Sequence, residues 1–309
     1  MAQILNLGFD GGATKTTCVA LDSDLRQVVE STGPASNFQI IGTDKASENL
    51  LKLTESVLKQ AGADYADIGS IYLGLTGAGR ISDADRMRNT FMEHLQKRIS
   101  PLPIVRIGSD ALAALEGAFS GNPGMILIAG TGSILLAKDE QDRIHRVGGW
   151  GRYIGDEGSG YALGRSVLSA AARELDGRGP KTVITGLLRE RHGLDDQQAI
   201  IRAVYQDNLD IASLAPVVID AAASGDEVAM GIVRNAASEL ADHVQAAMTK
   251  LPSMVRIALI GSIVSTENPL SAEVRLTLQK RFPEVIINKP ENSPAMGAAL
   301  LAAKSKGQK

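Results

Sequence analysis

Short apolar runs alternate with apolar residues at three- and four-residue spacing along the first 120 residues. The runs predict strands, and the helical spacing predicts amphipathic helices. The predicted strands are residues 4–9, 16–21, 28–31, 71–75 and 103–107. The predicted helices are residues 45–61, 83–98 and 111–120. This mixture of elements indicates an α/β fold.

A turn-forming cluster, FSGNPG, interrupts this pattern at residues 119–124. We therefore predict one domain over residues 1–120 and a second over 121–291, with a helix at about 292–305 that could return to the first. Residues of about 150–225 read as mostly helical, which indicates an insertion in the second domain. Apolar helical faces at 217–223 and 228–248 could pack in the core or across a homodimer interface.

Three segments of the first half recur in the same order in the second half. GFDGGATKTTCVALD at residue 8 resembles LIAGTGSILLAKD at residue 127, each an apolar run, a glycine-containing turn and a second apolar run. SIYLGLTGAG at residue 70 pairs with VRIALIGSIV, and RIGSDALAALEGA at residue 106 pairs with INKPENSPAMGAALLA. A duplicated α/β unit would place its two glycine turns toward one ligand, as a nucleotide site requires.

Composition and charge exclude several classes of protein. The 309 residues carry a net charge of −3, so no sequence-independent attraction to nucleic acid is expected. The single cysteine, Cys18, excludes an intramolecular disulfide, and we expect it to be a small buried residue. No run reaches the roughly 18 apolar residues of a membrane helix, and no signal peptide is recognisable. We therefore expect a cytoplasmic protein without nucleic-acid or membrane partners.

The turn in DGGATKT, residues 10–16, has two interpretations. It is not a P-loop, because Lys15 follows Thr14 rather than glycine and a strand follows. Its glycines could supply the positive φ angles of an ordinary hairpin. Alternatively, the backbone N–H groups of Gly11 and Gly12 could approach phosphate oxygens.

Five motifs decide between these interpretations: DGGATKT, SDALAAL (109–115), AGTGS (129–133), GGWGRYIGDEGSG (148–160) and IALIGSIV (257–264). Together they resemble the sugar kinase–Hsp70–actin superfamily, and within it the N-acetylglucosamine kinase / BadF-BadG-BcrA-BcrD ATPase family. The resemblance implies a two-lobed, actin-like ATPase (ribonuclease H-like) fold with duplicated mixed-sheet domains and a nucleotide cleft. It also implies an ATP-dependent kinase that phosphorylates the 6-hydroxyl of an amino sugar, most simply N-acetylglucosamine.

The resemblance assigns residues to the nucleotide side of the reaction. Asp10 is expected to hold Mg²⁺ through water, since this ion takes few carboxylates. The expected ATP-binding residues are Gly11, Gly12, Thr14, Lys15, Thr131, Gly132, Gly225, Gly261 and Ser262.

Asp110 is the expected general base, although an Asp at this place could simply cap the helix that follows. The resemblance assigns sugar contacts to Asn37, Asp110, Ser133, Gly149, Trp150 and Asp156. From the residues alone, Asn37 could cap a turn, Trp150 could be core packing, and Asp156 could be a helix cap. The sequence does not show whether Arg152 points at substrate or solvent.

Rival functions share some of these motifs. Glucosamine kinase and N-acetylmuramate kinase differ only in how the pocket treats the 2- and 3-substituents of the sugar. A reductase-activating ATPase needs two cysteine ligands per subunit for a bridging iron–sulfur cluster, and this chain has one. A chaperone-like or actin-like ATPase would give the GGWG…GDEGS loop no role.

Overall fold

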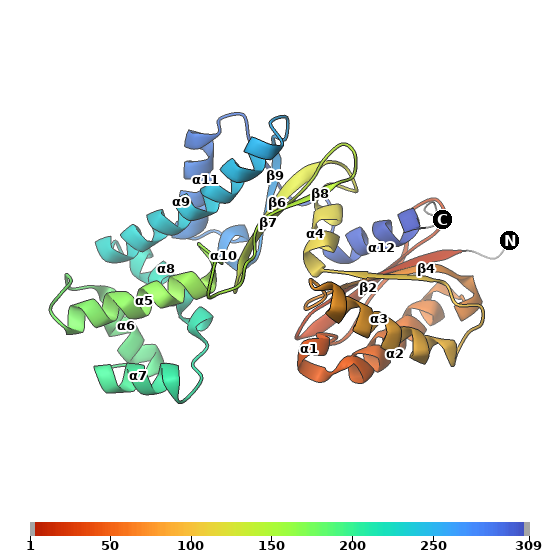
Figure 1. Cartoon of the computed structure of the whole chain (residues 1–309), viewed down its shortest axis with the longest axis horizontal. Helices are drawn as coiled ribbons and strands as arrows, with labels where there is room; N and C mark the ends of the chain where they lie inside the picture. The colour runs from red at the N-terminus through yellow and green to blue at the C-terminus, as the bar shows by residue number, and fades with distance from the viewer. Residues whose placement is uncertain (1–3, 306–309) are drawn as a thin grey trace. The chain divides into compact units, whose positions relative to one another are not determined.

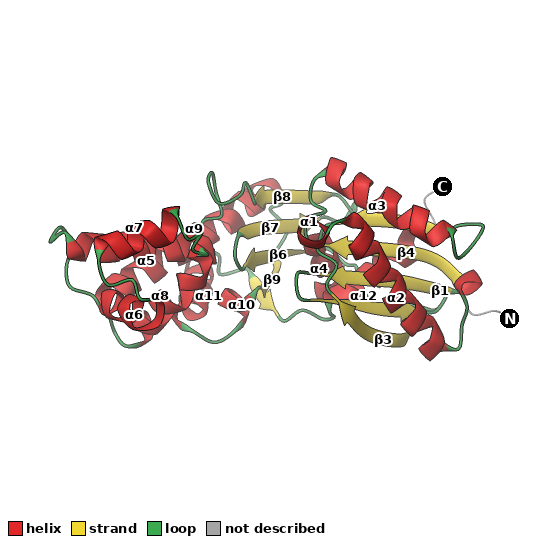
Figure 2. Ribbon diagram, turned by 90° about the horizontal axis from the view of Figure 1, so that it is seen from below, coloured by secondary structure: helices red, strands yellow, loops and turns green. Residues whose placement is uncertain are grey.

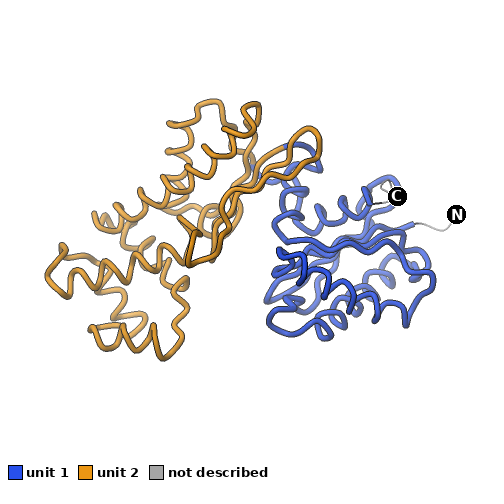
Figure 3. The backbone as a smooth tube through the Cα atoms, viewed as in Figure 1, with its two compact units in different colours: residues 1–123, 289–309 blue, residues 124–288 orange. Residues whose placement is uncertain are grey.

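The computed structural model describes residues 4–305, and Figure 1 labels their helices and strands. The chain forms two compact units, coloured separately in Figure 3. The first unit runs to Pro123 and resumes at Lys289, and the second is Gly124–Asn288.

The first unit contains a five-stranded sheet in the order β3-β2-β1-β4-β5. Strands β1, β2 and β3 pair antiparallel, and β4 and β5 add in parallel beside β1. The bounds are β1 Leu5–Gly11, β2 Lys15–Leu21, β3 Gln27–Pro34, β4 Ile68–Leu75 and β5 Ile104–Gly108. Its helices are α1 Phe38–Ile41, α2 Thr43–Ala61, α3 Ile81–Gln96, α4 Asp110–Ala118 and α12 Pro294–Lys304, with the 3₁₀ turn η1 Tyr65–Asp67. All the strands and helices predicted for residues 1–120 are present, with ends shifted by at most about three residues.

The second unit repeats this topology. Its sheet has the order β10-β9-β6-β7-β8, with β6, β7 and β8 antiparallel and β9 and β10 parallel beside β6. The bounds are β6 Gly124–Ala129, β7 Ser133–Lys138, β8 Ile144–Gly148, β9 Arg256–Ile260 and β10 Ile286–Asn288. The three sequence repeats therefore correspond to β1 and β6, β4 and β9, and β5 and β10. The predicted α/β fold with duplicated mixed sheets is confirmed.

Helix α12 belongs to the first unit, although it comes from the end of the chain. It packs closely on β1, because a Cβ on Gly8 would lie 1.9 Å from the backbone nitrogen of Ala299. It packs as closely on α4, because a Cβ on Gly297 would lie 2.0 Å from the carbonyl oxygen of Ala113. Glycine at both positions lets the backbones approach.

The chain between β8 and β9, where the insertion was predicted, is mostly helical. They are α5 Gly160–Leu175, α6 Val183–His192, α7 Gln197–Tyr205, η2 Ile211–Leu214, α8 Ala215–Ala223 and α9 Glu227–Lys250. The short α10 Ser262–Ser265 and α11 Pro269–Arg281 follow β9. Figure 2 shows these helices grouped at the end of the β6–β9 strands.

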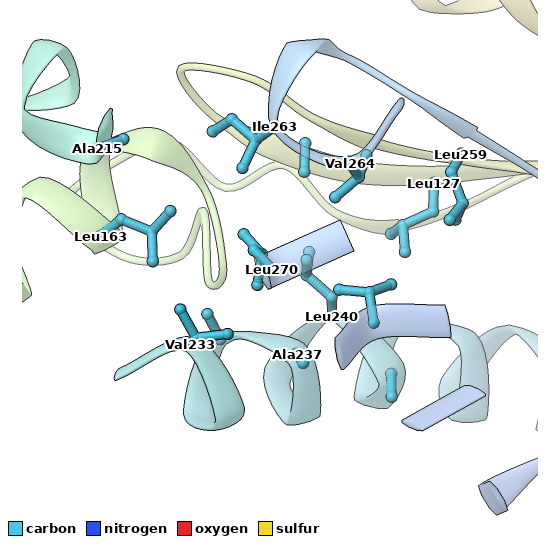
Figure 4. Close-up of a cluster of buried hydrophobic side chains, with 14 of the residues drawn as sticks. Leu127, Leu163, Ala215, Val233, Ala237, Leu240, Leu259, Ile263, Val264 and Leu270 are labelled. Carbon is cyan, nitrogen blue, oxygen red and sulfur yellow. The ribbon is translucent and has the colours of Figure 1, made fainter. Parts of the chain in front are cut away.

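The core of the second unit explains the spacing of apolar residues along α9. Val233, Ala237 and Leu240 recur at four- and three-residue intervals and are fully buried. They lie in one cluster with Leu163 from α5 and Leu127 from β6 (Figure 4). This face of α9 is therefore part of the unit's own core.

Cys18 is a buried residue of the first sheet. It lies in β2 with no exposed surface, and burial raises the pKa of its thiol. The expectation that it is a small buried residue is confirmed. Between residues 4 and 305, no helix combines the length and apolar character that crossing a membrane requires.

Candidate functional site

The turn between β1 and β2 is a true hairpin, in which Gly11 serves close packing. Neither Gly11 nor Gly12 has a positive φ angle, so the interpretation based on positive φ is wrong. A Cβ on Gly11 would lie 2.0 Å from Oγ of Ser36, which leaves room for no side chain. The N–H of Gly12 donates to the carbonyl of Lys15 at 3.1 Å and is used within the turn. Thr14 and Lys15 are exposed at the hairpin tip, where both side chains can donate hydrogen bonds.

Two carboxylates, Asp10 and Asp110, lie near each other in the first unit. Burial, with the negative charge of Asp110, raises the pKa of Asp10 to about 6, and Lys15 opposes this shift. Because a cation would relieve both the burial cost and the repulsion, the pair suits a divalent ion.

Asp110 is held at the start of α4, but it is not the N-cap. The cap is Ser109, whose side chain accepts from the N–H of Leu112, so the helix-cap interpretation of Asp110 is wrong. Oδ1 of Asp110 accepts from the N–H of Ala111 at 2.8 Å, and Oδ2 accepts from the hydroxyl of Thr76 at 2.6 Å. Each carboxylate oxygen keeps a second lone pair for another proton.

Asn37 lies beside the β1–β2 hairpin and is 8% exposed. Its side chain caps α1 by accepting from the N–H of Gln39 at 3.1 Å. Its own N–H donates to the carbonyl of Gly12. The capping interpretation is thus confirmed, and a sugar contact by Asn37 stays a prediction.

The second glycine turn, Gly130–Gly132, lies between β6 and β7 and is tied to α5. The N–H of Gly160 donates to the carbonyl of Gly130 at 2.7 Å, and the N–H of Tyr161 donates to the carbonyl of Thr131 at 3.2 Å. The side chain of Thr131 remains exposed. The first turn of α5 therefore fixes the shape of this loop and leaves the hydroxyl of Thr131 available.

Asp156 and Glu157 bind the start of β7. Asp156, at φ +62°, accepts from the N–H of Ser133 at 3.2 Å, and α5 is capped by Ser159 rather than by Asp156. The hydroxyl of Ser133 donates to the carbonyl of Glu157 at 2.7 Å, and Ser133 is 2% exposed. The side chain of Ser133 is closed in by the loop, and a sugar contact by this residue stays a prediction.

The glycine-rich loop, residues 148–160, presents large apolar side chains to solvent. Trp150, Tyr153 and Ile154 are 73%, 83% and 77% exposed, so the core-packing interpretation of Trp150 is wrong. Gly149 has a φ of +69°, which favours glycine. The guanidinium of Arg152 lies over the rings of Tyr153 and Tyr161, at 5.1 and 5.8 Å from their centroids.

A pocket of about 460 Å³ adjoins the second glycine turn within the second unit. Gly130, Thr131, Asp210, Ala212, Ser213, Pro216, Ile219, Ser262 and Asn268 are among its lining residues. Gly261 follows β9 with a φ of +103°, and a Cβ there would lie 2.3 Å from the carbonyl oxygen of Ala129. This position therefore requires glycine. Gly225, in the turn between α8 and α9, is not among the residues that line this pocket, and its nucleotide contact stays a prediction.

Sequence reasoning missed several residues of these sites. Thr76 follows β4 as Gly261 follows β9, so the repeat could have identified it. Asp210 and Pro216 belong to the helical insertion, where no motif indicated a pocket. Among residues 4–305 no group of three or more His, Cys, Asp or Glu side chains could hold a metal ion. A metal ion at Asp10 would therefore have few protein ligands.

The comparisons with known proteins agree over the full chain. A sequence model of the BadF/BadG/BcrA/BcrD ATPase family matches residues 7–302. The chain is 30% identical to the N-acetyl-D-glucosamine kinase of Dictyostelium discoideum, over 99% of this chain and 100% of the relative. It is 31% identical to the N-acetylmuramic acid/N-acetylglucosamine kinase of Clostridium acetobutylicum, over 96% of this chain and 97% of the relative.

A solved structure from Chromobacterium violaceum, assigned as an N-acetylglucosamine kinase, shares the fold. It has a TM-score of 0.73 and 27% identity, and the match covers 97% of this chain and 99% of that one. The resemblance drawn from the five sequence motifs is thus confirmed. With the family match spanning both sheets and both glycine turns, the chain belongs to the BadF/BadG/BcrA/BcrD ATPase family.

Proposed function

We propose that this protein is an ATP-dependent kinase that phosphorylates the 6-hydroxyl of N-acetylglucosamine. The observation that carries the proposal is the setting of Asp110, a carboxylate held at a helix start by Thr76 and its own helix. The curated relatives in the comparison are named as kinases of this sugar. Glucosamine and N-acetylmuramate are the rival substrates.

Asp110 acts as the general base. The backbone N–H of Ala111, at the positive end of α4, donates to its Oδ1. Its remaining lone pairs can take the proton of the sugar hydroxyl as that oxygen attacks the γ-phosphorus of ATP. The bond from Thr76 fixes the direction of Oδ2.

The two glycine turns bind the phosphates of ATP. Thr14 and Lys15 of the first hairpin and Thr131 of the second turn are exposed donors. The pocket lined by Thr131 and Ser262 takes the adenosine, because it adjoins the second glycine turn.

Asp10 would hold Mg²⁺, in part through water. Bound there, the ion would spread the negative charge of the phosphates during transfer. The fit rests on the raised pKa of Asp10, which reports a carboxylate that is costly to ionise without a cation beside it. Lys15, which lowers that pKa, supplies part of the compensation within the chain.

The proposed sugar contacts are those of Asn37 and of the glycine-rich loop. Asp156 can accept from sugar hydroxyl groups on the lone pairs that the N–H of Ser133 leaves free. Trp150 offers an exposed aromatic surface to the sugar ring. Gly149 lets the backbone approach the ligand.

A coupled ADP-release assay tests the proposal with N-acetylglucosamine, glucosamine, N-acetylmuramate and glucose. We expect N-acetylglucosamine to give the highest kcat/KM, and 6-deoxy-N-acetylglucosamine to give no ADP above background. Higher kcat/KM with glucosamine or N-acetylmuramate would assign the rival substrate. Equal values for glucose and N-acetylglucosamine would refute recognition of the acetamido group, and no sugar-dependent ADP release would refute the kinase.

A further inference from the structure

His243 is a buried side chain of α9 that lies beneath the root of the glycine-rich loop. It is 6% exposed, and its ring fills the space under the end of β8. A Cβ on Gly148 would lie 2.3 Å from Nε2 of this ring, so the backbone rests directly on the imidazole. Gly148 itself has a φ of +71°, where the chain turns from the strand into the loop.

The hydrogen bonds of His243 direct one ring nitrogen toward the loop. Nδ1 lies 2.9 Å from the carbonyl oxygen of Glu239, and a carbonyl can only accept, so Nδ1 carries a hydrogen. Nε2 lies 3.8 Å from Oε2 of Glu157, a separation longer than a hydrogen bond, and the two form an ion pair when the imidazole carries hydrogens on both nitrogens. Among the charged side chains of the described residues, Glu157 is the partner that the ring meets on the loop.

Glu157 carries this contact to the residues that we assign to the sugar. Its carbonyl accepts the hydroxyl of Ser133, and its neighbour Asp156 accepts the N–H of the same residue. The loop root is held from its other side by Arg146 of β8, which donates to the carbonyls of Gly148 and Gly149. His243 is therefore one contact between α9 and the loop segment that contains Asp156.

We infer that His243 is a positioning residue, which holds the glycine-rich loop through Glu157 and so sets the recognition of the amino sugar. This inference rests on the proposed function for its effect on the sugar. Its effect on the loop can be measured without any substrate. The contacts of His243 are with Gly148, Glu157 and Glu239, so its loss should affect the sugar more than the nucleotide.

The activity test compares three variants with the wild-type protein. His243→Leu fills the space without a donor, His243→Gln keeps an N–H donor, and Glu157→Gln removes the charge of the partner. We expect His243→Leu and Glu157→Gln to raise the KM for N-acetylglucosamine by about tenfold, as small displacements of a binding group do. KM for ATP should stay within about twofold, and the double variant should be no worse than either single one.

A matched control is His145→Leu. His145 is also a histidine beside a carboxylate, with Nε2 2.8 Å from Oδ2 of Asp139, but it lies near the far end of β8. It should leave the KM for the sugar unchanged. His243→Gln should fall between wild type and His243→Leu.

Trp150 gives a readout that is independent of sugar phosphorylation. It is the chain's single tryptophan and lies in the glycine-rich loop. In ligand-free protein, we expect its fluorescence anisotropy to fall in His243→Leu and Glu157→Gln and to remain at the wild-type value in His145→Leu.

Unchanged Trp150 anisotropy in both His243→Leu and Glu157→Gln would overturn the inference, whether or not the protein phosphorylates a sugar. A lower melting temperature with unchanged KM for the sugar would also overturn it, since it would assign His243 to stability alone. If His243→Leu fails to fold, Glu157→Gln decides alone, because the Glu157 side chain is 40% exposed and its change is mild. Altered anisotropy without activity on any sugar would support the loop contact and refute only the proposed function.

Discussion

The hydroxyl of Thr76 donates to Oδ2 of Asp110 at 2.6 Å, which joins the end of β4 to the start of α4. If Asp110 is the base, Asp110→Asn should lower kcat by about 10²–10⁴-fold, because the amide cannot take a proton. The KM for the sugar should change less. Near-normal turnover in steady-state assays would refute the assignment, provided that the variant retains the melting temperature of the wild type.

Thr76→Val should have a smaller effect than loss of the carboxylate itself. It removes the bond that orients Oδ2 and keeps the base, so we expect kcat to fall by about tenfold, the effect of one hydrogen bond to a charged group. Thr76→Ser keeps the hydroxyl and serves as the control. Equal losses in the valine and serine variants would show that the hydroxyl is not responsible.

Thr131→Val tests the second glycine turn. The side chain is exposed, and its carbonyl is held by α5, so the substitution should remove only the hydroxyl. We expect a rise of about tenfold in the KM for ATP, with the KM for the sugar little changed. Unaltered ATP kinetics would argue against a phosphate contact by this residue.

Gly261→Ala should damage the end of β9. Its φ of +103° and the 2.3 Å approach of a Cβ to the carbonyl of Ala129 leave no room for a methyl group. We expect a loss of about 1–3 kcal/mol in unfolding free energy, measured by urea denaturation, together with weaker ATP binding.

Gly231→Ala is the matched control for Gly261→Ala. Gly231 lies in α9 with open space around its Cβ position and no positive φ. Alanine there should raise stability by about 0.5–1 kcal/mol, because glycine is a poor helix former. Destabilisation by both alanines to the same degree would contradict the backbone argument at Gly261.

The stability of the metal-free protein should depend on pH through Asp10. Its pKa is about 6 in the folded protein against 3.8 for an unperturbed Asp, so between these values the folded state keeps a proton that the unfolded state has lost. Stability therefore falls as pH rises through this window, by up to roughly 3 kcal/mol, since each pKa unit corresponds to 1.36 kcal/mol. Urea denaturation in EDTA should show that Asp10→Asn removes this part of the pH dependence and stabilises the protein above pH 6. Parallel curves for variant and wild type would refute it.

The sequence predicted the elements of the first unit and the duplication because both depend on local patterns. Apolar periodicity located β1 to β5, and the glycine turns marked the repeated strand pairs. It could not predict the reason for glycine at residue 11, which is the approach of Ser36 from another segment. Such contacts depend on tertiary packing that no window of sequence contains.

The candidate site was predictable only where a motif names residue types. Asp110 was found through SDALAAL, but its cap, Ser109, and its partner, Thr76, were not. The buried hydroxyl of Ser133 shows the converse, since a motif residue can be used to hold a loop. No sequence motif indicates His243, because its proposed role depends on the contact between α9 and the glycine-rich loop.

The return of α12 to the first unit has a consequence for biosynthesis. Residues 124–288 are contiguous, so this unit can fold as soon as they have left the ribosome. The other unit begins earlier but must wait, with the face around Gly8 uncovered, until α12 has been synthesised. The order of folding during translation is therefore the reverse of the order in which the two units begin.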